Sequence, residues 1–178
     1  MSAVSYRPRY TIEDYVLWEG DWELWDGLPV SMSPSPGFAH QRVARQLLLH
    51  IHPQLNSDRC EKDCEIIAEL DWRVSTSTVV RPDGMIVCDG GDEAYLSFRP
   101  DLAVEILAPS TREKDLVAKR ELYAVEGVPF YLLIDPEERS LVLLARDEAG
   151  VYREIPAEKP FDLHPGCTLQ FDGSELFA

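Results

Sequence analysis

The stretch PDLAVEILAPST, residues 100–111, places one carboxylate inside an otherwise apolar run. Both alternating sets of side chains around Glu105 are apolar, which predicts a strand covered on both faces of a sheet, and Pro109 ends it. An ionised carboxylate in such a strand is costly unless a cation, a metal ion or several hydrogen-bond donors meet it. Functional sites often lie where the local pattern breaks in this way, so Glu105 is the first candidate site residue.

Length and composition suit one globular domain over residues 1–178, because the 178 residues are 45% hydrophobic and 28% charged. The sequence has no apolar run long enough to span a membrane and no hydrophobic signal core at its start, so we expect a cytoplasmic protein. The 17 basic and 32 acidic residues give a formal net charge of −15. This charge argues against nonspecific binding of polyanions, so DNA would have to bind locally, through a basic patch or carboxylate-held metal ions.

The four cysteines do not resemble a disulfide framework. Cys88 and Cys167 are isolated, and only a charged Glu-Lys-Asp separates Cys60 from Cys64, so we expect reduced thiols. Cys60, Cys64 and a histidine could in principle bind zinc. Their spacing is poor and no second cysteine pair follows, which disfavours such a site.

The N-terminal region predicts a helix and a hairpin. Residues 11–18 begin with a threonine cap and acids in the first turn, which is typical of a short helix. Residues 22–32 are two strand-like runs about Asp26-Gly27, a strong hairpin signal. Glu23 lies in the first of these strands, where a solvated surface residue is the ordinary interpretation.

A second carboxylate interrupts a predicted strand near the middle of the chain. Residues 65–74 and 78–88 predict an antiparallel pair of strands, and Asp83 follows Pro82 inside the second. Aspartate is a poor choice there for stability alone, although a turn that simply ends the strand would also explain it. His40 lies in the first turn of a predicted helix over residues 40–51, where a local hydrogen-bonding role is commoner than a ligand role.

A predicted strand–helix–strand unit places a lysine close to Glu105. Residues 112–126 form a predicted helix in which Lys119 shares the apolar stripe, and residues 128–136 predict a buried strand. The right-handed crossover of this unit lays the helix over the sheet, so that Lys119 faces Glu105. A weak ion pair with Asp115, or a lysine extending past the core edge, are the structural alternatives.

These patterns predict an α/β fold with a mixed central β-sheet flanked by helices, plus the N-terminal helix and hairpin. The strands from Thr78, Asp101 and Pro129 should lie side by side. Two carboxylates and a lysine are the parts needed for metal-assisted phosphodiester hydrolysis. The carboxylates and a backbone carbonyl would hold Mg²⁺, and the lysine would position the attacking water or help to deprotonate it, and would offset charge on phosphorus.

The sequence resembles the Uma2-like family (DUF820) of restriction-endonuclease-like proteins, within the PD-(D/E)xK nuclease superfamily. The matching stretches are residues 22–27, 32–34 with 40–42, 81–83, 100–111, Lys119 with Tyr123, and 127–131. The resemblance implies a restriction-endonuclease-like core acting on DNA with Mg²⁺ or Mn²⁺. It also implies that Asp83 and Glu105 bind the metal, joined by Glu23; we assign the backbone carbonyl to Ile106. A homodimer is the usual assembly for reaching both strands.

One position departs from the superfamily pattern. That pattern puts a lysine two residues after the second acid, and here the position is Leu107. Lys119 is the matching lysine, on the following helix, and its four methylenes allow it to reach the site. Two alternatives stay open: a catalytically inactive protein that keeps the fold as a binding module, and a metal-dependent hydrolase of a small phosphoester.

Overall fold

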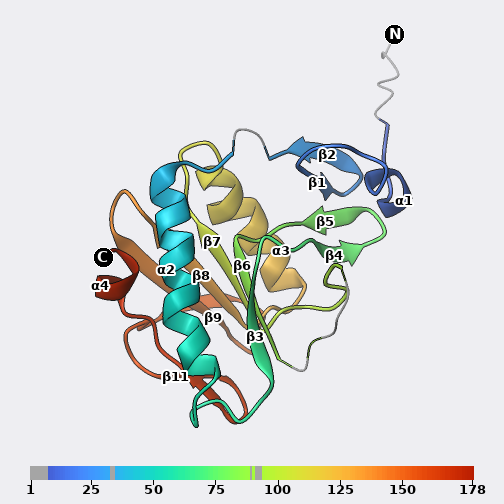
Figure 1. The fold of residues 1–178 in the computed structure, drawn as a ribbon. Helices are drawn as coiled ribbons and strands as arrows, with labels where there is room; N and C mark the ends of the chain where they lie inside the picture. The colour runs from blue at the N-terminus through green and yellow to red at the C-terminus, as the bar shows by residue number, and fades with distance from the viewer. Residues whose placement is uncertain (1–7, 33–34, 89, 91–93) are drawn as a thin grey trace.

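The computed structural model describes residues 8–32, 35–88, 90 and 94–178. Its centre is a six-stranded sheet with strand order β10-β9-β8-β7-β6-β3 (Figure 1). The strands are β3 (Cys64–Ala68), β6 (Gly84–Cys88), β7 (Leu102–Ile106), β8 (Phe130–Asp135), β9 (Ser140–Arg146) and β10 (Tyr152–Ile155). Strands β7 and β8 are parallel and the other neighbouring pairs are antiparallel. The predicted mixed sheet and the strand–helix–strand unit around Glu105 are therefore confirmed.

Helices cover both faces of this sheet. On one face, α2 (Phe38–Leu55) buries an apolar stripe against alternate side chains of β6, β7 and β8. On the other face lies the β7–β8 crossover, which is a π-helical segment, η1 (Lys114–Lys119), followed by α3 (Arg120–Val125). Because side chains alternate along a strand, Glu105 belongs to the same face as Ala103 and Leu107, which pack in the core beneath α3. The helix that carries Lys119 and the side chain of Glu105 therefore lie on the same face of the sheet, as the sequence predicted.

The N-terminal elements form a smaller sheet beside the first. It has the order β2-β1-β5-β4, from β1 (Trp22–Trp25), β2 (Leu28–Ser31), β4 (Trp72–Ser75) and β5 (Thr78–Val80), next to the short helix α1 (Ile12–Tyr15) (Figure 1). Asp26 and Gly27 have φ of 46° and 79°. Two successive positive φ values are what a tight two-residue hairpin turn requires, so the Asp-Gly signal correctly predicted this hairpin.

The two long strands expected over 65–74 and 78–88 are each broken and divided between the two sheets. Only β6, the second half of the Thr78 strand, lies beside the Glu105 strand; β5 pairs instead with β1 and β4. The break falls at residues 81–83, where Pro82 has no N–H to donate to a neighbouring strand. Asp83 therefore stands at the entrance to β6, between the two sheets.

The C-terminal residues form a separate hairpin and a short helix. Strands β11 (Phe161–His164) and β12 (Cys167–Leu169) pair with each other, and α4 (Gly173–Leu176) follows and contacts α2. None of the helices in the described ranges is long and apolar enough to cross a membrane.

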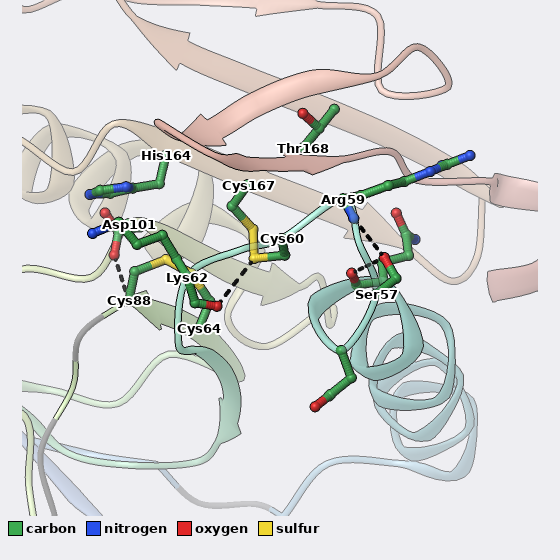
Figure 2. Close-up of a disulfide and its surroundings, with 12 residues drawn as sticks. Ser57, Arg59, Cys60, Lys62, Cys64, Cys88, Asp101, His164, Cys167 and Thr168 are labelled. Atoms are coloured by element: carbon green, nitrogen blue, oxygen red, sulfur yellow. Dashed lines mark hydrogen bonds between the residues drawn. A yellow bond between two sulfur atoms is a disulfide. The ribbon is translucent and has the colours of Figure 1, made fainter.

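The expectation of reduced thiols is wrong for this structure. Cys60 is bonded to Cys167 and Cys64 to Cys88, and the two disulfides are neighbours (Figure 2). Cys64 and Cys88 face each other in the β3–β6 register, and Cys60 faces Cys167 across an isolated bridge. Sequence spacing could not reveal this, because tertiary pairing joins cysteines that are up to 107 residues apart.

Candidate active site

A polar pocket lies between the two sheets, the first turn of α2 and the η1 segment. Its volume is about 710 Å³. Charged and polar side chains from five different segments line it, and they include His40, Arg81, Asp83, Glu105, Lys114, Asp115 and Lys119. Of the five predicted site residues, Asp83, Glu105 and Lys119 share this pocket. Glu23 and Ile106 do not line it, but Glu23 is ion-paired with Lys119, and the backbone N–H of Ile106 donates to Asp83.

Asp83 is fixed by the break that precedes β6. Its Oδ2 accepts a hydrogen bond of 2.7 Å from the backbone N–H of Ile106, the residue after Glu105. His40 Nε2 lies 3.2 Å from the same oxygen, so the residue that sequence left without an assigned role contacts a predicted site acid. No hydrogen bond within the described ranges reaches Oδ1 of Asp83. That oxygen is the one available to a ligand.

Glu105 is almost completely buried, with 1% of its surface exposed. Its Oε1 accepts hydrogen bonds from Lys119 Nζ at 2.8 Å and from Tyr123 Oη at 2.7 Å. Burial raises the pKa of Glu105 well above its ordinary value; attraction to Lys119 opposes this shift, and repulsion from Asp83 and Asp115 adds to it. In the absence of a further cation, Glu105 therefore tends to hold a proton.

Lys119 is also buried, at 2% exposure, and its ammonium group is surrounded by acceptors. Besides Glu105, Nζ lies 3.2 Å from Glu23 Oε1 and donates to the carbonyl oxygen of Arg81 at 3.2 Å. Burial alone would lower the pKa of Lys119, but the surrounding carboxylates raise it above its ordinary value. Lys119 is accordingly a charged donor at neutral pH.

The π-helical geometry of η1 places a third acid in the pocket. Asp115 and Lys119 are four residues apart, both face inward, and Lys119 Nζ lies 3.8 Å from Asp115 Oδ1. Asp115 Oδ2 accepts a hydrogen bond from Thr111 Oγ1 at 2.8 Å, whereas Oδ1 is buried without a hydrogen-bond partner. Burial raises the pKa of Asp115. Single-turn π-helical segments are frequent at functional sites, where they redirect side chains in this way.

Glu23 is fully buried and both of its oxygens are occupied. Oε1 meets the backbone N–H of Arg81 and the Lys119 ammonium, and Oε2 meets Trp25 Nε1 and, at 2.7 Å, Lys114 Nζ. Burial raises the pKa of Glu23, but the two lysines more than reverse this and lower it to about 2. The sequence analysis did not predict Lys114 as a site residue. The spacing of a helix gives no sign that this lysine will reach an acid 91 residues away.

The residues present fit a hard divalent cation. Among the described residues, the carboxylates of Glu23, Glu105 and Asp115 are ion-paired with the ammonium groups of Lys114 and Lys119, and Asp83 lies in the same pocket. With all four acids ionised, their negative charges exceed the two lysine charges by two. Oxygen donors are the ligands that Mg²⁺ and Mn²⁺ prefer. Oδ1 of Asp115, which is buried without a hydrogen-bond partner in the described part of the chain, is a further oxygen that a cation could satisfy.

The mixed sheet, with acids at adjoining ends of β6 and β7 and a lysine on the crossover helix, defines a restriction-endonuclease-like α/β protein. A family model described as "Uma2: Putative restriction endonuclease" matches residues 12–171, and the chain belongs to this Uma2 family.

The fold is similar to a crystal structure described as "a putative nuclease belonging to DUF820 from Anabaena variabilis ATCC 29413", with a TM-score of 0.74. The two share 15% sequence identity over 94% of this chain and 97% of the other. At that identity the likeness establishes the fold. No curated protein matches the sequence significantly.

Proposed function

We propose that the protein is a metal-dependent endonuclease that hydrolyses DNA phosphodiester bonds. The observation that carries this proposal is the contact of 2.8 Å between Lys119 Nζ and Glu105 Oε1, in the same pocket as Asp83. Membership of the Uma2 family, whose description names a restriction endonuclease, supports the same activity.

Asp83 and Glu105 are the residues that would hold Mg²⁺ or Mn²⁺, with the backbone carbonyl of Ile106. Asp115 joins them in the proposal because its buried Oδ1 accepts no hydrogen bond from the described residues and lies 3.8 Å from Lys119 Nζ. When bound, the ion would polarise a phosphate oxygen and make a water molecule more acidic. Glu23 does not need to contact the ion, because both of its carboxylate oxygens already accept from other groups of the protein. Its role would be to hold Lys114 and Lys119 in place.

Lys119 would assist the attacking water by electrostatics. Because its pKa is raised, it is an ammonium group at neutral pH and cannot take the water's proton. It can donate a hydrogen bond that orients the water, and its charge opposes the negative charge that develops on phosphorus. Glu23, Glu105 and the Arg81 carbonyl fix its position before substrate arrives, so little reorganisation is needed during the reaction.

His40 would act as a positioning residue for Asp83. Its Nε2 lies 3.2 Å from Asp83 Oδ2, the oxygen that also accepts from Ile106. Two contacts on Oδ2 leave Oδ1 turned toward the pocket. His40 is 7% exposed and its Nδ1 has no hydrogen-bond partner, so the ring is held mainly by this one contact.

The charge of the chain shapes how DNA would bind. With a formal net charge of −15, the protein repels a polyanion at long range. The divalent cation would supply local attraction at the pocket, so affinity for DNA should depend on the metal ion as well as on salt. A homodimer is part of the proposal, because two copies related by a two-fold axis could each cut one strand.

The test is a cleavage assay with supercoiled plasmid and with short single- and double-stranded DNA, in Mg²⁺, in Mn²⁺ and in EDTA. We expect cleavage only with metal, and none by Asp83→Asn. A parallel assay with an aryl phosphate separates a small-phosphoester hydrolase from a nuclease. Metal-dependent DNA binding without cleavage of any substrate would instead favour a binding module that retains the fold.

A further inference from the structure

We propose that the four cysteines form a second metal site, a zinc site that assembles when the two disulfides are reduced. The sulfur atoms of Cys60, Cys64 and Cys167 all lie within 4.8 Å of one another. The fourth sulfur, that of Cys88, is bonded to Cys64. The fold thus gathers three sulfurs at one point, with the fourth bonded to one of them, although their sequence spacing does not suggest it (Figure 2).

The backbone holds the four cysteines in place independently of the sulfur bonds. Cys64 and Cys88 are opposed in the β3–β6 ladder with Cα atoms 4.0 Å apart. Cys60, in the loop between α2 and β3, is opposed to Cys167 at the start of β12 with Cα atoms 3.8 Å apart. On both sides of the Cys60–Cys167 bridge, backbone hydrogen bonds join Glu61 N to Gly166 O and Thr168 N to Arg59 O. Reduction would therefore leave two neighbouring pairs of thiols, with the members of each pair held opposite each other.

The arrangement suits zinc in size and in chemistry. Four thiolates at about 2.3 Å from a tetrahedral zinc ion lie about 3.8 Å apart, which is within the spread of the three clustered sulfurs. Thiolates select soft or borderline ions over Mg²⁺. All four cysteines are at least nine-tenths buried, so the ion would be sheltered as in a closed structural site.

The chemistry of assembly balances with a dithiol as reductant. Each disulfide would take two electrons and two protons from a dithiol, which would become a cyclic disulfide, and four cysteine thiols would result. Binding of Zn²⁺ would then release the four thiol protons to solvent. A surface hollow of about 400 Å³ is lined by Arg59, Glu61, Gly166 and Thr168, the chain neighbours of Cys60 and Cys167.

The four cysteines would therefore link the same segments of the fold in two ways, through disulfides or through a zinc ion. The disulfides tie the loop after α2, the edge strand β3, the strand β6 and the hairpin β11–β12 together. A zinc ion held by the same four cysteines would tie the same segments where disulfides do not persist. The site is separate from the proposed nuclease centre, since none of the four cysteines lines the pocket that contains Asp83 and Glu105.

The probe is Co²⁺, which reports thiolate ligands by its absorption. The full chain is reduced with a phosphine, which takes oxygen from water, becomes the phosphine oxide and leaves no competing thiol. We expect thiolate-to-cobalt charge-transfer bands and tetrahedral visible bands that saturate at one thiolate-bound Co²⁺ per chain, apart from any Co²⁺ held by the carboxylate site, and loss of these bands when Zn²⁺ is added. Cys64→Ser should lose these bands, whereas Asp83→Asn, which alters only the carboxylate site, should keep them.

Folding is monitored alongside by circular dichroism and by melting curves. Reduction in the presence of Zn²⁺ should preserve the fold and give a higher Tm than reduction with EDTA. Reduced protein that has four titratable thiols but no charge-transfer band would overturn the proposal. So would equal bands in Cys64→Ser, or a reduced chain that unfolds equally with and without Zn²⁺. A failure of DNA cleavage would leave these results unaffected, because the two sites share no residue.

Discussion

Lys119 Nζ lies 2.8 Å from Glu105 Oε1, although the two residues are fourteen positions apart and on different elements. The superfamily pattern would place the lysine two residues after the acid, at Leu107, whose side chain is instead buried in the core beneath α3. The crossover helix supplies the ammonium group that the strand does not. The same lysine–acid contact is therefore made, but from a helix and not from the strand that carries the acid.

Metal ions should stabilise the protein, and more so at higher pH. The pKa of Glu105 is raised in the folded state, so the folded chain keeps a proton that the unfolded chain loses above its ordinary pKa. The free energy of unfolding of the metal-free protein should therefore fall as pH rises through and above that range. A divalent cation replaces the proton, so Mn²⁺ should raise Tm more at pH 8 than at pH 6.

Melting curves in EDTA and in millimolar Mn²⁺ across this pH range measure the effect. Asp83→Asn should abolish the rise in Tm, and Glu105→Gln should flatten the pH dependence in EDTA. A Tm that does not respond to Mn²⁺ at either pH would count against a competent metal site.

Glu23→Gln should be strongly destabilising. Glu23 is fully buried and forms ion pairs with Lys114 and Lys119. A neutral glutamine at this position would leave both lysines without that carboxylate. Breaking one side of a buried ion pair costs about 3–5 kcal/mol. The lowered pKa of Glu23 has the opposite pH signature from Glu105: its contribution is present above pH 4.5, the ordinary value, and is lost as pH falls toward 2.

Urea unfolding at pH 7 measures the loss, with Glu154→Gln, an exposed glutamate on β10, as the matched control. The control should change stability by less than about 0.5 kcal/mol. If Glu23→Gln is as stable as the control yet no longer responds to Mn²⁺, then Glu23 is a metal ligand and not the anchor of the lysines.

The meeting of Lys119 with Glu105 could be predicted from sequence because two regular periodicities fixed it. The apolar stripe of a helix and the alternation of a strand each assign a face, and a right-handed crossover brings those faces together. Asp83 was also found, since an acid after Pro82 breaks an apolar pattern. The division of its strand between two sheets was not, because β5 and β6 have the same apolar character and differ only in tertiary partners.

The remaining site residues depend on contacts that local spacing does not encode. Asp115 was interpreted as the partner of a weak helix ion pair, and only the π-helical turn and burial show it as a third pocket acid. Lys114 was not among the predicted site residues. The cysteine pairs were missed for the same reason, since Cys60 and Cys167 meet only through the docking of β12 beside the loop after α2.

The disulfides should make the oxidised chain measurably more stable. The Cys60–Cys167 bond closes a loop of about 107 residues, for which loss of chain entropy in the unfolded state predicts about 4–5 kcal/mol. The double variant Cys60→Ser/Cys167→Ser should therefore unfold at lower urea than the oxidised parent. Thiol titration of the denatured oxidised protein should find no thiols. Four thiols in air-purified protein would contradict the pairing.

The substitution Lys119→Met tests whether Lys119 is a catalytic residue. Methionine keeps a similar apolar stem, Lys114 still pairs with Glu23, and Glu105 can hold a proton, so the fold should survive. Loss of one preorganised electrostatic donor should lower the rate of cleavage by about 10²–10³. The rise in Tm with Mn²⁺ should persist, because the metal-binding oxygens remain.

The decisive measurement is the initial rate of plasmid cleavage in Mn²⁺ by the parent, Lys119→Met and Asp83→Asn proteins, each first shown to be folded by its melting curve. The account predicts a large loss of rate with retained metal response for Lys119→Met, and loss of both for Asp83→Asn. Cleavage at the parental rate by a folded Lys119→Met protein would contradict it and assign this buried lysine to structure alone.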